Sequence, residues 1–163
     1  MRILIPAIWC LLLAGCGTFA SDPTVLKPLS SAELHSLKLA GINVEVAPGV
    51  KMGDADVARV RFEIEAAIRA KRPAVFVNSE SGWVMKLRFT KFGYGNAANH
   101  DASDYREVAR MAAQVAIVDS NGEVRGQYEV YSEEGLGGLT GGLSPSDDME
   151  EGFVKTIMNI VDK

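Results

Sequence analysis

Apolar and polar residues alternate in an early part of the chain, and this pattern predicts a β-strand. Ile42, Val44 and Val46 are separated by polar residues, a period of two that is typical of a strand with one buried face. The expected strand covers residues 37–47. The alternation changes phase at residues 40–41, where a β-bulge would bring both parts onto one face.

The next stretch changes to a helical period and predicts a helix over residues 54–71. Asp54 is the expected N-cap, because its carboxylate can accept hydrogen bonds from the first backbone N–H groups. Pro73 would end the helix. The apolar residues that share one stripe of it are Val57, Val60, Ile64, Ala67 and Ile68.

Three further strands are predicted between this helix and the end of the chain. Residues 83–92 alternate most clearly, and residues 105–118 and 123–132 flank Asn-Gly at 121–122, which is a strong hairpin signal. The apolar run at 74–77 allows one short additional strand.

A last amphipathic helix is expected to begin at Ser144 and Pro145. Ser144 suits the N-cap and Pro145 the first helical position. The apolar stripe of this helix consists of Met149, Phe153, Ile157 and Ile160.

The predicted order is β-α-β-β-β-α, and it indicates the α+β class. We expect an antiparallel sheet of three to four strands with two helices on one face, in a single domain over residues 32–163. The opposite face of the sheet would be polar and open to solvent or to a partner. Its basic residues are Lys86, Arg88, Arg110 and Arg125.

The start of the chain predicts secretion. Arg2 followed by the apolar run 3–14 has the charge and length of a signal peptide. The run is too short for a membrane span, which needs about 20 residues. It ends at Leu13-Ala14-Gly15-Cys16, which resembles the lipobox that signal peptidase II cleaves in bacterial lipoproteins. The alternative is an ordinary secretory signal that is cleaved after Ala20.

The lipobox interpretation divides the first part of the chain into two segments. Residues 1–15 would be a signal peptide, and residues 16–31 would be a tether that starts at a lipidated Cys16. Two or more acyl chains would hold the protein stably on a membrane. By resemblance to enterobacterial lipoproteins, Gly17 indicates the outer membrane, with the domain facing the periplasm.

Composition excludes several classes of function. The chain has 17 basic and 21 acidic residues, and an acidic chain without a basic run is not typical of nucleic-acid binding. Cys10 would leave with the signal and Cys16 would carry lipid, so no cysteine would remain for a disulfide, a metal site or a nucleophile. No cofactor is predicted.

Candidate chemistry is sparse. His100, Asp101 and Asp104 lie in one predicted loop and form the candidate for a weak ligand or metal site, although their spacing matches no zinc signature. The glycine-rich stretch 133–143 lacks the lysine of a phosphate-binding loop. No catalytic residue is assigned, because no nucleophile motif such as G-x-S-x-G is present.

Several features together resemble known bacterial lipoproteins. They are the lipobox, the short tether, the β-α-β-β-β-α domain, a Gly-Asn-Ala segment at 95–97 and an Asp-x-x-Gly hairpin at 119–122. This combination resembles uncharacterised families of small lipoproteins. The architecture is also similar to the periplasmic domains of curli-assembly and penicillin-binding-protein-activator lipoproteins. The resemblance implies accessory or assembly roles, through oligomers or partner enzymes.

The sequence therefore favours a non-enzymatic outer-membrane lipoprotein. Its domain would bind a protein partner, or copies of itself, in envelope assembly, export or maintenance. A second hypothesis is a binder of a small molecule, glycan or ion that uses the His100 loop and the glycine-rich loop. A third hypothesis, an envelope hydrolase, predicts turnover that depends on His100.

Overall fold

The computed structural model describes residues 21–79, 81–93, 109–133 and 145–162, and the elements below are those of these ranges. In chain order they are β1 (Thr24–Lys27), α1 (Ser31–Ser36), β2 (Leu39–Val46), α2 (Asp54–Lys71), β3 (Trp83–Gly93), β4 (Arg110–Val118), β5 (Val124–Glu133) and α3 (Pro145–Val161).

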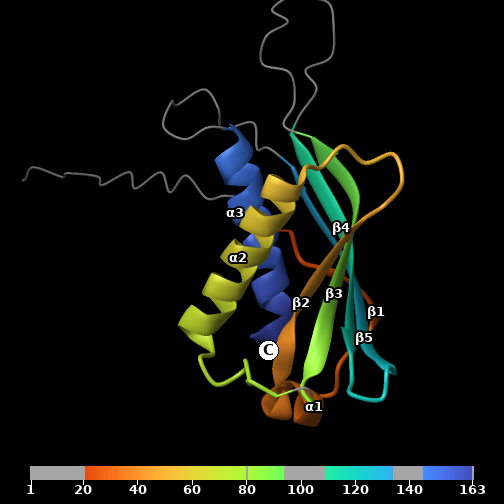
Figure 1. The fold of residues 1–163 in the computed structure, drawn as a ribbon, viewed down its shortest axis with the longest axis vertical. Helices are drawn as coiled ribbons and strands as arrows, with labels where there is room; N and C mark the ends of the chain where they lie inside the picture. Colours follow the sequence, from red (N-terminus) through yellow and green to blue (C-terminus); the bar gives the residue numbers. More distant parts are fainter. Residues whose placement is uncertain (1–20, 80, 94–108, 134–144, 163) are drawn as a thin grey trace, which may run out of the picture.

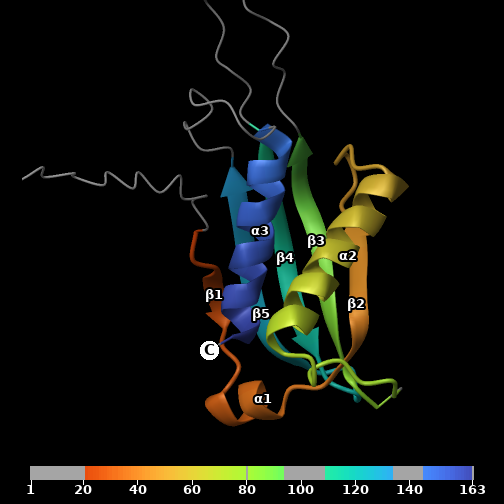
Figure 2. The ribbon, with the colours of Figure 1, turned by 90° about the vertical axis from the view of Figure 1, so that its left-hand side faces the viewer.

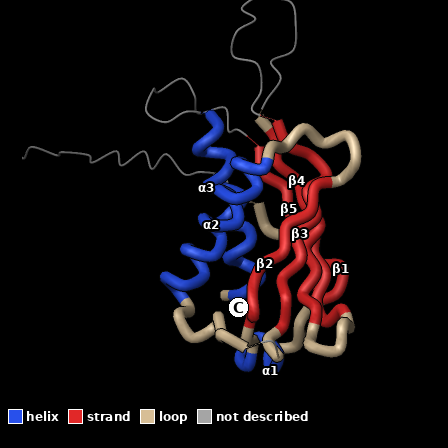
Figure 3. The backbone as a smooth tube through the Cα atoms, in the orientation of Figure 1, coloured by secondary structure: helices blue, strands red, loops and turns tan. Residues whose placement is uncertain are grey.

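The described strands form one open sheet in the order β1-β5-β4-β3-β2. β2 and β3 are parallel, whereas the other three pairs are antiparallel. α2 and α3 lie side by side on one face of the sheet, and α1 lies at one end (Figure 1, Figure 2). The result is a two-layer α+β arrangement (Figure 3).

The sheet differs from the expected one in two respects. It is mixed rather than antiparallel, because the 18-residue helix α2 returns the chain to the same end of the sheet before β3 begins. It also has five strands in the described ranges, since β1 forms within the residues 16–31 that were expected to be a tether. All residues of β1 are exposed, so this strand has no apolar alternation that could predict it.

The described ranges contain three helices rather than the expected two, because α1 forms at Ser31–Ser36, where the sequence indicates no helical period. Most of the other expected elements are confirmed. α2 has the predicted bounds, and the β2–β3 register shifts between Leu39 and Gly41, as the bulge requires. The N-cap of α2 is Gly53 rather than Asp54, because the carboxylate of Asp56 accepts from the Gly53 N–H at 3.3 Å. The expected cap of α3, Ser144, lies outside the described residues.

The expected hairpin at residues 121–122 is confirmed, and the run at 74–77 forms less than a full strand. The β4–β5 hairpin turns at Gly122, whose φ is +83°, and Asp119 Oδ1 accepts from the N–H groups of Asn121 and Glu123 at 2.9 Å each. The run at 74–77 contributes only an isolated parallel bridge between Phe76 and Leu39.

The core lies between the helix pair and the sheet. Phe153 of α3 and Phe89 of β3 are fully buried, and their ring centroids are 5.4 Å apart. The hydroxyl of Ser132 on β5 donates to the carbonyl oxygen of Met149 at 2.8 Å, which attaches α3 to the sheet. Among the described helices, none combines the length and the apolar character that crossing a membrane requires.

Candidate functional site

No described helix or strand covers the sheet face that points away from the helices, and only the connection between β2 and α2 extends on that side, at one end of the sheet (Figure 1). We call this sheet face the open face. On its central strands its residues are Lys86, Arg88 and Thr90 of β3, Ala112, Gln114 and Ala116 of β4, and Gln127, Glu129 and Tyr131 of β5. These positions alternate with the buried positions of the same strands, because successive side chains of a strand point to opposite faces of the sheet. The residues between the core positions therefore lie on the open face.

Lys86 and Arg88 lie at the middle of the open face, as the sequence predicts. Lys86 is opposite Ala116 and Arg88 is opposite Gln114 in the β3–β4 ladder. Both basic side chains are exposed, and neither forms an ion pair with another described residue. Their charges are therefore available to a partner.

Arg110 lies at the far end of the same face, where β4 begins. Its guanidinium is 3.8 Å from the carboxylate of Glu133 on β5. The hydroxyl of Tyr131 donates to Glu133 at 2.6 Å. Burial and this neighbouring carboxylate raise the pKa of Tyr131. Arg110 thus belongs to a local polar cluster and is separate from Lys86 and Arg88.

A hollow of about 390 Å³ lies on the open face where β1, β5 and β4 run side by side. We call it the Tyr131 hollow. Ala112 leaves space beside its cross-strand partner Tyr131. Ser21 closes one end, since its hydroxyl donates to the carbonyl oxygen of Tyr131 at 2.6 Å. Asp22 and Glu129 also line the hollow, and no lysine or arginine is among its described lining residues.

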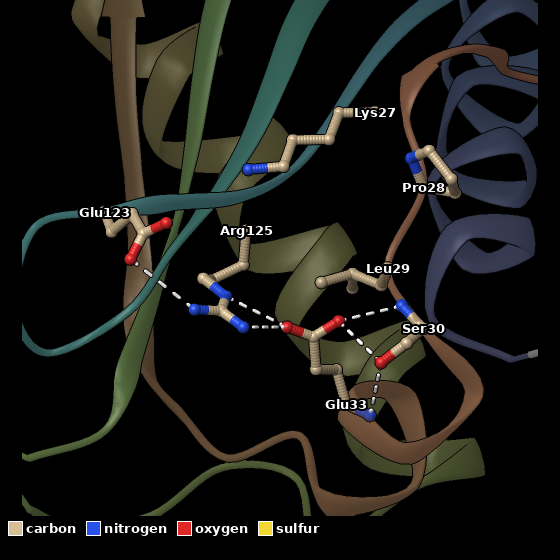
Figure 4. A pocket seen from close by; sticks show the side chains of 7 residues that line it. All are labelled: Lys27, Pro28, Leu29, Ser30, Glu33, Glu123 and Arg125. Atoms are coloured by element: carbon tan, nitrogen blue, oxygen red, sulfur yellow. Dashed lines mark hydrogen bonds and ion pairs between the residues drawn. The ribbon is translucent and has the colours of Figure 1, made fainter.

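Arg125 is directed away from the other three basic residues. The β4–β5 register shifts between Ile117 and Val118, opposite this part of β5. The guanidinium of Arg125 binds the carboxylate of Glu33 on α1, with Nε and Nη2 donating to Oε1 at 2.9 and 2.6 Å. Figure 4 shows this pair within a second hollow, at the end of the sheet near α1. Arg125 therefore fixes α1 on β5.

Glu33 is held in its charged form by several donors. The hydroxyl and the backbone N–H of Ser30 donate to Oε2 at 2.7 and 2.8 Å, and Arg125 donates to Oε1 (Figure 4). These bonds, first of all those from Ser30, lower the pKa of Glu33 from its usual value of 4.5 to about 2.

This lowered pKa predicts a pH-dependent role of Glu33 in stability. A group with a depressed folded-state pKa stabilises the fold above its unfolded pKa, and this contribution disappears as the pH falls through the folded value. The variant Glu33→Gln is expected to be less stable than the wild type at pH 7. The difference should narrow between pH 4.5 and about 2. Urea unfolding at a series of pH values measures it.

Glu123→Gln is the matched control. The Glu123 side chain is 65% exposed and lies 3.5 Å from Arg125, so its replacement should cost much less at pH 7. A difference between wild type and Glu33→Gln that stays constant from pH 7 to pH 2 would contradict the assignment.

The remaining predicted site residues lie outside the described residues. They are Cys16, His100, Asp101 and Asp104, together with most of the glycine-rich stretch 133–143. Within the described ranges, no group of three histidine, cysteine, aspartate or glutamate side chains is placed to hold a metal ion.

Comparison with known proteins identifies the fold. No protein-family model matches the chain, and no curated protein matches its sequence. Two crystal structures of the PelC dodecamer from Paraburkholderia phytofirmans, one of them of a single-residue variant, are similar in structure. Their TM-scores are 0.51 and 0.53, at 14% and 15% identity, and the alignments cover 85% and 86% of this chain and 95% and 94% of PelC. The chain therefore shares its fold with PelC.

A further structural match scores lower. The minor lipoprotein from Acinetobacter baumannii aligns with a TM-score of 0.33 at 14% identity, over 76% of this chain and 84% of the other.

Proposed function

We propose that this protein is a lipid-anchored lipoprotein of the bacterial outer membrane, and that its periplasm-facing domain binds protein rather than catalysing a reaction. The bound protein is another copy of the chain or an envelope partner that acts in assembly, export or maintenance. The observation that carries the proposal is the open face, on which Lys86 and Arg88 have no ionic partner among the described residues.

The anchor rests on the lipobox at residues 13–16. Lipid on Cys16 would keep the domain within reach of the membrane, because the chain between Cys16 and the first strand at Thr24 is short. Anchoring raises the local concentration of the domain near a membrane partner or near other copies, and this favours weak contacts.

The open face supports the binding role. It presents exposed basic side chains together with amide side chains and half-buried alanines. Exposed charges of this kind steer association and select partners. The shared fold with PelC, which was crystallised as a dodecamer, supports self-association.

The test is crosslinking in the cell, with identification of the products by mass spectrometry. The wild type is compared with Cys16→Ala, which should leave the membrane fraction. It is also compared with Arg88→Glu, which should weaken a specific crosslink. Arg88 is exposed on the surface, so its replacement should change the free energy of unfolding by less than about 1 kcal/mol.

Lys155→Glu is the control for charge reversal. Lys155 is also exposed, but it lies on α3, in the helix layer on the opposite side of the sheet, so its crosslinks should match those of the wild type. The absence of any specific crosslink in the wild type would contradict the proposal. An unchanged crosslink in Arg88→Glu would exclude the centre of the open face as the contact.

A further inference from the structure

The outer surface of α2 carries an apolar ridge that no described element covers. Phe62 is 70% exposed, more than any other large hydrophobic side chain among the described residues. It lies in line with exposed alanines at a spacing of three or four residues, which places them on one side of a helix. This surface, the Phe62 ridge, consists of Ala55, Ala58, Phe62, Ala66 and Ala70.

α2 carries four basic and four acidic residues, but the exposed ones are mostly basic. Two of the basic residues are already paired, Arg59 with Asp56 and Glu150, and Lys71 with Asp162. The exposed charged residues of α2 are Arg59, Arg61, Arg69, Lys71 and, as the single acidic member, Asp54. The remaining acidic side chains of α2 are half-buried. Arg61, directly beside Phe62, forms no ion pair with a described residue.

The Tyr131 hollow has the complementary properties. Its volume of about 390 Å³ is larger than the cavity of about 150 Å³ that accepts a benzene molecule, so it has room for a phenyl ring. Asp22 and Glu129 line it, and neither forms an ion pair with a described residue. The hollow can therefore receive an aromatic side chain that is flanked by arginine.

The two surfaces lie on opposite sides of the domain. α2 belongs to the helix layer and the hollow to the open face of the sheet (Figure 1). One copy cannot join them within itself, but the ridge of one copy can contact the hollow of the next. Such head-to-tail contacts use two different patches, and they generate a ring when the rotation between copies closes.

We propose that Phe62 of one copy inserts into the Tyr131 hollow of a second copy, with Arg61 placed near Glu129 and Asp22. This inference rests on the self-association in the proposed function and assigns its interface. The partner is a second copy because the same chain carries both an exposed phenyl ring beside Arg61 and a hollow with two carboxylates that is large enough for such a ring.

The first test measures assembly of the full-length protein, extracted from membranes in mild detergent, as a function of concentration by light scattering. Phe62→Glu should raise the concentration needed for half-assembly by about tenfold or more, because a buried aromatic anchor usually dominates an interface. The same variant should unfold at the wild-type temperature as a monomer, since Phe62 is exposed there. Val124→Glu, which alters an apolar side chain that is 38% exposed at the start of β5, is the matched control.

The outcomes separate this inference from the proposed function. If the wild type assembles and Phe62→Glu assembles equally well, the interface is wrong and self-association stands. If the wild type stays monomeric over the whole concentration range, the interface is also overturned. The proposed function then depends only on whether crosslinking in the cell finds a different protein.

The second test is disulfide formation between two variants. Ala66→Cys, one helical turn from Phe62 on the ridge, and Thr90→Cys, in the lining of the hollow, both keep the Phe62 ring. The two variants are purified separately, mixed and oxidised, and linked positions are identified by mass spectrometry. A head-to-tail contact predicts a link between positions 66 and 90 in the mixture. A link from position 66 to position 66, or no link at either position, would overturn the proposal.

Discussion

Replacing Phe153 with alanine is expected to lower the free energy of unfolding by about 3–5 kcal/mol. Phe153 is fully buried in α3, and its ring centroid is 5.4 Å from that of Phe89 on β3. The loss includes the transfer free energy of the ring, the cavity that it leaves and the contact between two aromatic rings. A domain has only about 5–15 kcal/mol of stability, so this one change would remove a large part of it.

Urea unfolding followed by far-UV circular dichroism measures this loss. Phe62→Ala is the matched control, because it removes the same side chain from an exposed position. At concentrations where the chain is monomeric it should change the stability by no more than about 0.5 kcal/mol. A loss below about 1 kcal/mol in Phe153→Ala would contradict the packing of α3 on β3.

The sequence predicts the parts of this fold whose signal is local. The bounds of α2, the bulge in β2 and the hairpin at Gly122 follow from apolar period and turn chemistry within a few residues. The parallel direction of β2 and β3 cannot be predicted in this way, because it depends on the end of the sheet to which α2 returns the chain. β1 has no apolar face, and it exists only through its pairing with β5, about a hundred residues away.

The same distinction between local signals and contacts across the sequence applies to the candidate site. Lys86 and Arg88 are predicted correctly as exposed, because each lies between buried neighbours on a regular strand. The alternation also assigned Arg125 to the open face, but a register shift and an ion pair with Glu33 direct it to α1. The Tyr131 hollow could not be predicted, since Ser21 and Tyr131 are 110 residues apart in the sequence.

Arg72 is expected to contribute more stability than any other exposed or half-buried charge in the described ranges. It is the C-cap of α2, and its guanidinium donates to Val161 O at the end of α3 and to Leu34 O of α1, the latter at 2.8 Å. Carbonyl oxygens in the last turn of a helix lack the usual partner four residues on, and besides Arg72 the Leu34 oxygen accepts from the described residues only a long bond of 3.4 Å from the Leu37 N–H. One side chain thus connects the ends of three helices.

Replacing Arg72 with methionine is expected to lower the free energy of unfolding by about 2–4 kcal/mol. Each hydrogen bond from a charged donor contributes about 1.5–3 kcal/mol, and water can reach the half-buried carbonyls and recover part of the loss. Methionine keeps most of the apolar length of the side chain, so the decrease in the free energy of unfolding measures the contribution of the guanidinium group. Urea unfolding of the two proteins at pH 7 measures the difference.

Lys71→Met is the control at the neighbouring position. It removes the same charge from a side chain that connects fewer elements, so it separates the effect of bridging from the effect of charge. Lys71 pairs with Asp162 at 3.0 Å, but both side chains are about half exposed, and such pairs contribute about 0–1 kcal/mol. Arg72→Lys should recover only part of the stability, because one ammonium group lacks the planar fork that reaches two carbonyl groups at once. Equal losses in Arg72→Met and Lys71→Met would mean that the three helix ends hold together without Arg72, through the apolar contacts of Val161 and Leu34 alone.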